Sequence, residues 1–411
     1  MKYFLFYLTI YNFIFPIRLL LIPKSEYLLY LIPVIWASFN KGKILKALTI
    51  FEFKLTIVFV FLMLIIGTLS SIINDGDFMS LTIFIKFFVA VIFSLVVILW
   101  GLSLFGENFF KQLLSIITFS GLIIGIACIL EYFSFPFKML LLNIIDTTGN
   151  TEYGESYRTH GFASSGGASL SLGMSIVSIL TYLRFKMSNN KLQAVLYYTI
   201  FLLVFLSTLV IGRTGFFLGL PVIIYFLIFE GNNFSNTLPK ILFLIIVFFG
   251  ISEIITLMSS DDLNILYKYG LEPIYNYLEN DSFEAKSSNQ VSNMYYLPQF
   301  EHLILGAGYW RWPTHGYSLS DVGYMKILMS TGMIGFFIFF GFQLKIYLKA
   351  IRFYIREFKF KVVFIALFLL PFIAEFKEEF LTQNYGFKIL IILIVFSWIQ
   401  NKNKNINKCV V

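Results

Sequence analysis

Side chains that can bind anions or move protons are concentrated at 306–327 of this apolar sequence. The segment, GAGYWRWPTHGYSLSDVGYMKI, holds Arg311, His315, Asp321 and Lys326 among five aromatic residues. Arginine binds phosphate and carboxylate groups through paired hydrogen bonds, and imidazole and carboxylate groups exchange protons with a hydroxyl within hydrogen-bond reach. Taken alone, Asp321 could equally cap the start of the helix predicted to follow it or belong to a functional site. Lys326 lies one turn further into that helix, and an ionisable residue at such a depth in a membrane should face a hydrated cavity. We therefore predict a site here.

A second polar segment, YRTHGFASSGG at 157–167, precedes another apolar run. It places Arg158 and His160 before the small residues 164–167. Backbone N–H groups at a helix start suit an anion, while small residues equally suit close packing between membrane helices. Both interpretations of the small residues stay open, and Arg158 is the stronger candidate for function.

Arg213 is the third candidate cation. It lies in STLVIGRTGFFLG, at the boundary of a predicted helix. The topology given below predicts that this boundary is on the outer side of the membrane, where cations are disfavoured. Gly215 permits close approach of a partner. The alternative is an arginine that extends to lipid headgroups.

Charged residues also separate the last two apolar runs. Glu375, Lys377, Glu378 and Glu379 are expected to form a solvated acidic loop, with support of a neighbouring site as the alternative.

The elements that must position these residues are membrane helices. The sequence is 58% apolar and 13% charged, with a mean hydropathy of +0.81, which excludes a soluble globule and predicts an all-α integral membrane protein made of a single domain, 1–411. Runs of about 20 apolar residues predict about twelve transmembrane helices. They fall near 3–22, 26–40, 54–73, 80–104, 110–133, 164–184, 192–210, 213–230, 239–258, 322–348, 361–375 and 382–400.

Lysine and arginine set the expected orientation. They concentrate at 41–54, 184–191, 345–361 and 402–408, which the positive-inside rule assigns to the cytoplasm together with both termini. The connections 134–163 and 259–320 then face outward, and they contain every histidine. The net charge of +8 reflects this topology, so no nucleic-acid partner is expected.

Several motifs are missing from the sequence. It has no GxxxxGK[ST], HExxH, CxxC or GxGxxG pattern, so ATP hydrolysis, zinc hydrolysis and dinucleotide chemistry have no support. We expect no cofactor and no metal.

The order of these motifs resembles a known family. The RTG helix start, the R-x-x-G-F segment at 158–162 and LGAGY…DVGYMKILMSTGMIG together resemble O-antigen polymerases of the Wzy type, over about Tyr157 to Gly335. The resemblance implies a metal-independent, inverting glycosyltransferase of the GT-C kind at the periplasmic face of the bacterial inner membrane. Its substrates would be undecaprenyl-pyrophosphate-linked repeat units in the membrane lipid, and a chain-length regulator protein is an implied partner.

The resemblance also assigns roles to residues. Arg158, Arg213 and Arg311 would bind the pyrophosphate. In the ligase branch a histidine lies eleven residues before the first glycine of a G-x-x-G pair; Gly332 begins that pair here and the matching residue is Asp321, so Asp321 and His315 both remain candidates for the base.

Other assignments stay open. Lys286 stands where many family members carry an arginine, and His160, Tyr324 and Lys326 are further candidate substrate contacts. Tyr309, Trp310, Trp312 and Tyr317 suit stacking on sugars or an interfacial aromatic belt. An O-antigen ligase and a lipid-linked oligosaccharide flippase or other transporter are the alternative functions.

Overall fold

The computed structural model describes residues 1–22, 25–146, 159–229, 245, 276, 291–311, 319–358, 360–382 and 384–408. In this part of the chain every element is a helix, apart from isolated β-bridges that join Leu19 to Ile22 and to Ile145. The all-helical class predicted from the sequence is confirmed.

Six described stretches are long and apolar enough to cross a membrane, which makes the chain a multi-pass membrane protein. They are α4 (Phe51–Ile73), the stretch formed by α5 (Met79–Phe105) and α6 (Phe109–Phe133), α9 (Gly167–Lys186), α10 (Lys191–Ile211), α17 (Gly323–Glu357) and α19 (Tyr385–Lys408). A short 3-10 turn separates α5 from α6 at Gly106, whose φ of 54° cannot continue a helix.

The shorter helices depart from the predicted runs. The expected helix over 3–22 is wrong in length: α1 (Lys2–Ile14) has 13 residues, or about 20 Å, because Pro16 disfavours helical backbone before it. The run 26–40 is divided into η1 (Ser25–Tyr30) and α2 (Leu31–Phe39). The run 239–258 lies outside the described residues, apart from Ile245.

Three further short helices are described, of which the lysine-rich first one is polar and the other two are apolar. They are α3 (Lys41–Leu48), α11 (Arg213–Phe229) and α18 (Lys361–Ala374).

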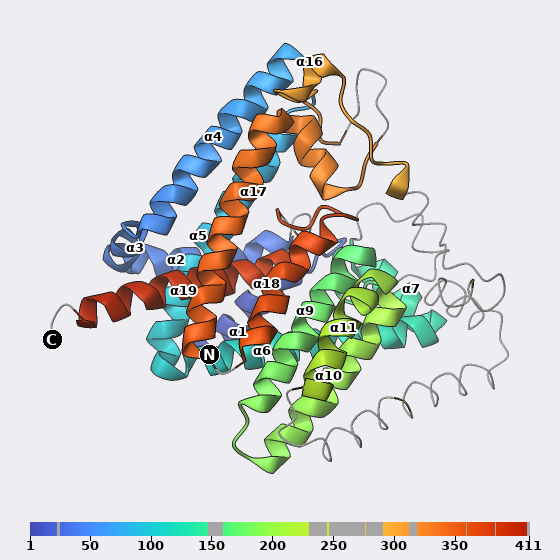
Figure 1. Ribbon diagram of the computed structural model, residues 1–411. Coiled ribbons are helices and arrows are strands. Elements are labelled where there is room, and N and C mark those ends of the chain that lie inside the picture. The colour runs from blue at the N-terminus through green and yellow to red at the C-terminus, as the bar shows by residue number, and fades with distance from the viewer. Residues whose placement is uncertain are drawn as a thin grey trace. The chain divides into compact units, whose positions relative to one another are not determined.

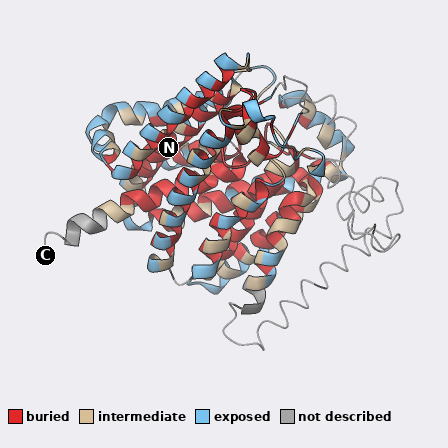
Figure 2. Cartoon of the chain, turned by 45° about the horizontal axis from the view of Figure 1, so that its top comes forward, coloured by how far each residue is buried: buried red, intermediate tan, exposed pale blue. Residues whose placement is uncertain are grey.

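The chain divides into two compact units. Unit 1 contains 1–14, 25–116 and 287–411, and in it α4 and α17 pack side by side, with α5 against α4 (Figure 1). Phe59 of α4 stacks on Phe342 of α17 with ring centres 3.9 Å apart. The first fifteen residues of α19 are almost all buried, and Figure 2 shows this helix in the buried colour until its C-terminal turns.

Unit 2 contains 15–24 and 117–286, and its described core is the packing of α9 against α10 and α11 (Figure 1). Small residues permit the close approach: the N–H of Gly215 donates to Ser171 Oγ at 3.1 Å, and a Cβ on Gly219 would collide with Ser175. The apolar segment after Phe133 forms α7 (Phe135–Ile144), capped by Ser134.

Candidate functional site

The predicted site segment in unit 1 is built around a sharp bend in α17. At Gly332 the backbone has φ 64° and ψ −170°, which breaks the helix into 323–331 and 333–357. Only glycine adopts this conformation without strain, and the carbonyl oxygen of Ile304 and the N–H of Gly306 lie where a Cβ would be. The predicted run 322–348 therefore begins as expected but is not one continuous helix.

The loop 304–311, which follows α16 (Phe300–Leu303), covers this bend. The carbonyl of Met329 accepts hydrogen bonds from Ala307 N at 2.7 Å and Gly308 N at 3.1 Å, and Ile334 N donates to Ile304 O at 3.3 Å. Backbone groups that lose helical partners at a bend need others when they are buried. The bend and the loop therefore require each other.

The turn between α4 and α5 holds the other side of the loop. Asn74 Nδ2 donates to the carbonyl of Gly306 at 2.9 Å. Asp77 Oδ2 accepts from the N–H of Trp310 at 3.0 Å and of Arg311 at 2.7 Å. The backbone that carries Arg311 is thus fixed, while its side chain is exposed. Sequence reasoning missed Asp77, whose only signal was the pair of acidic residues, Asp75 and Asp77, between two apolar runs.

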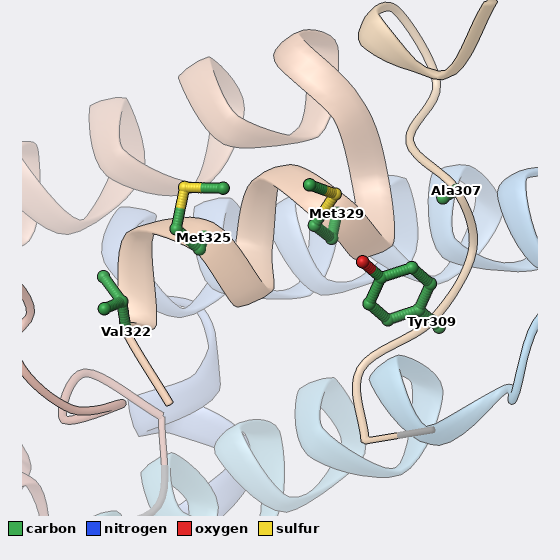
Figure 3. Packing of buried hydrophobic residues seen from close by; sticks show 5 residues of the cluster. All are labelled: Ala307, Tyr309, Val322, Met325 and Met329. Atoms are coloured by element: carbon green, nitrogen blue, oxygen red, sulfur yellow. The ribbon is translucent and has the colours of Figure 1, made fainter. Parts of the chain in front are cut away.

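A buried apolar cluster joins the loop to the first part of α17. Figure 3 shows Ala307 and the Tyr309 ring on the loop near Met329, with Val322 and Met325 closer to the helix start. The Tyr309 hydroxyl is 3.0 Å from that of Tyr296. This Tyr309 side chain is 3% exposed, so it serves packing and not an interfacial belt.

Lys326 is the centre of a charged group that we call the Lys326 cluster, made of Lys326, Asp321, Glu375, Glu378 and Glu379. Lys326 Nζ lies 3.7 Å from Glu379 Oε2 and 4.0 Å from Asp321 Oδ1. The indole N–H of the buried Trp310 donates to the same Glu379 oxygen at 3.0 Å. Asp321 is 60% exposed and Lys326 18%, so the cluster extends from the interior to the surface.

Tyr324, one of the candidate contacts, donates its hydroxyl hydrogen bond to the carbonyl of Phe372 at 2.8 Å.

The prediction of a solvated acidic loop at 375–379 is wrong. Glu375 is fully buried, and its Oε2 accepts from the N–H groups of Phe380 at 2.9 Å and Leu381 at 3.0 Å. Gly323 leaves no room for a Cβ beside this carboxyl group. The prediction failed because it considered only neighbouring residues. In the folded chain Lys326 of α17 lies beside this turn, and the local sequence shows only that the turn is polar.

Burial changes the acidity of two of these carboxyl groups. Desolvation of the charged form raises the pKa of Glu375 to about 8, although two backbone N–H groups oppose the shift. Desolvation also raises the pKa of Glu378 to about 7; Lys326 opposes this shift, and Asp321 and Glu379 add to it. Glu378 is only partly buried, so its carboxyl group is accessible. With this pKa, the group exchanges its proton near neutral pH.

Glu375 should make the stability of the protein depend on pH. Because its folded pKa lies above the unfolded value of 4.5, the unfolded chain loses this proton first, and stability falls as the pH rises from about 4.5 to 8. Glu375→Gln keeps an acceptor for both N–H groups but cannot titrate. The wild-type free energy of unfolding should fall on the order of 3 kcal/mol between pH 5 and pH 8, and the variant should not show this fall. Thermal unfolding in detergent at the two pH values measures the difference. The exposed Glu301→Gln is the control, and an unchanged pH dependence in Glu375→Gln would contradict the assignment.

In unit 2, His160 lies in a buried turn before α9. Glu131 Oε2 accepts from the N–H groups of His160 at 2.9 Å and Gly161 at 2.7 Å, and His160 Nε2 is 3.5 Å from Glu131 Oε1. Burial lowers the pKa of His160 to about 4, so the imidazole is neutral at pH 7. The N–H groups that bind a carboxylate here belong to His160 and Gly161, and the carboxylate is one of this chain that sequence reasoning missed. Anion binding by the N–H groups of 164–167 stays a prediction.

The remaining candidates are placed as follows. Arg213 is the first residue of α11 and is partly exposed in unit 2, whereas Arg311 belongs to unit 1. Arg158, Lys286 and His315 lie outside the described residues. Within the part of the chain that is described, no three His, Cys, Asp or Glu side chains are arranged to hold a metal ion.

These features define an all-helical, multi-pass membrane protein with a charged cluster beside a bent membrane helix. Comparison with protein-family models and with curated proteins found no match to the sequence.

Proposed function

We propose that the protein is a membrane glycosyltransferase that polymerises a bacterial polysaccharide. It would transfer a growing glycan from undecaprenyl pyrophosphate to a lipid-linked repeat unit, at the periplasmic face of the inner membrane. The observation that carries this proposal is the Lys326 cluster, which the bend in α17 brings next to the loop bearing Arg311.

The chemistry of this group suits such a transfer. A diphosphate leaving group is already activated, so the reaction needs a cation to stabilise the departing charge and a base for the acceptor hydroxyl. Arg311 is exposed on a backbone held by Asp77, and it supplies the cation. Glu378, with its pKa raised to about 7 by burial, is the candidate base that the structure adds to Asp321 and His315.

Lipopolysaccharide from a deletion strain tests the proposal. Loss of a polymerase leaves one repeat unit on the lipid A core, whereas loss of a ligase or a flippase leaves none. Complementation with Glu378→Gln should restore membrane insertion but reduce polymerisation by about 100-fold or more, the size of effect that a general base supplies. The exposed Glu301→Gln is the matched control. Absence of all repeat units in the deletion strain would overturn the polymerase proposal.

A transporter is the second candidate, favoured by the buried pair of Glu131 and His160. Ionisable residues buried at membrane helices are features of proton and substrate pathways. Both side chains are fully buried in unit 2. Under this alternative, the deletion strain and a Glu131→Gln strain should both lack every repeat unit.

A further inference from the structure

The second half of α17 borders a groove of about 660 Å³ at the end opposite to the Lys326 cluster. Four cations of this helix, Lys345, Lys349, Arg352 and Arg356, line the groove with Asn401 of α19. Their spacing of four, three and four residues places them on one face. Like charges at such spacings repel one another, so this arrangement costs stability unless an anion compensates it.

The chain compensates only part of this charge. Lys349 forms an ion pair with Glu52 of α4, and Arg356 Nε lies 3.1 Å from Glu357. Lys345 has Nζ 5.4 Å from the centre of the Phe51 ring. Arg352 forms no ion pair or hydrogen bond with any residue that the structure describes. Lys345 and Arg352 therefore leave two positive charges in the groove.

The far wall of the groove is held in place by side-chain contacts. Asn401 Oδ1 accepts from Arg356 at 2.8 Å. The next residue, Lys402, donates to the carbonyl of Lys46 at 2.9 Å and to Thr49 Oγ1 at 3.1 Å. The part of α19 that lines the groove is therefore held in position by these hydrogen bonds.

Apolar residues lie among the cations. Leu344 and Leu348 line the same groove, with 46% and 39% of their surfaces exposed. A ligand that complements this pattern carries a phosphate and an apolar chain. We propose that the groove binds an anionic phospholipid, whose phosphate contacts Lys345 and Arg352 and whose acyl chain covers the two leucines. The positive-inside rule assigns this end of α17 to the anionic cytoplasmic leaflet, and the site does not depend on the proposed glycosyltransferase.

Native mass spectrometry of the full chain tests the site. The protein is purified in detergent and titrated with phosphatidylglycerol or with phosphatidylcholine, and bound lipid is counted. We expect phosphatidylglycerol to bind preferentially. Lys345→Gln/Arg352→Gln should weaken its binding about 30-fold, which corresponds to about 2 kcal/mol for two cations.

The control is Lys41→Gln/Lys43→Gln, which removes two exposed cations of α3 that do not line the groove. It should retain binding, and neither variant should unfold below the wild-type temperature, because removal of repelling cations from the groove does not cost stability. Equal loss in the two variants would indicate a general basic surface and overturn the proposal. Complete displacement of the lipid by inorganic phosphate would instead show a site for free phosphate, which also overturns it.

Discussion

Arg311→Ala is expected to abolish long-chain polysaccharide while the protein still inserts into the membrane. Under the proposed function, this guanidinium stabilises the departing diphosphate, and loss of one such group costs about 100-fold or more in rate. The backbone bond from Arg311 to Asp77 remains in the variant, so folding should be unaffected. Gel analysis of chain length, with the protein level in the membrane as the reference, measures the effect.

Two further variants make this result specific. Arg311→Lys keeps a charge but not the paired hydrogen bonds, so it should restore only part of the activity. Lys54→Ala, which removes an exposed cation of α4, should leave chain length unchanged. Wild-type chain lengths in Arg311→Ala would exclude a role for this residue in the transfer.

Gly332→Ala is expected to destabilise the protein by roughly 2–4 kcal/mol, because a side chain at this φ is strained and would collide with the loop 304–306. The hydrogen bonds from Ala307 and Gly308 to Met329 would be lost with the bend. The fraction of folded protein in membrane extracts and its unfolding temperature in detergent measure the loss.

Gly341→Ala is the matched control in the same helix. No atom lies within 4 Å of a Cβ at Gly341, so alanine there should be neutral or stabilising by up to about 1 kcal/mol. Equal unfolding temperatures for the two variants would show that the bend at Gly332 is not required for folding.

The apolar runs predicted most helices, because a segment surrounded by lipid must satisfy its backbone hydrogen bonds within itself. For α4, α5, α6, α9 and α10, the observed ends fall within a few residues of the predicted ones. Asp321 and Lys326 were also predicted together, since five residues at a helix start span little more than one turn. For α1 the prediction failed because a proline interrupts the apolar run, and for α17 it failed because Gly332 bends the helix.

The sequence by itself determined the helical class and most of the long apolar helices, and it singled out the polar region at 306–327, because hydrophobicity and local spacing act over neighbouring residues. Only the tertiary structure decided that Glu375 and Glu379 are buried, that Trp310 reaches Glu379, and that Asp77 holds the loop of Arg311. The contacts of Trp310 with Glu379 and of Asp77 with the loop join residues 69 to 234 positions apart, beside a bend that one glycine permits. These contacts form because buried polar groups need hydrogen-bond partners in the folded chain. Composition and the neighbouring residues do not show which distant group becomes the partner.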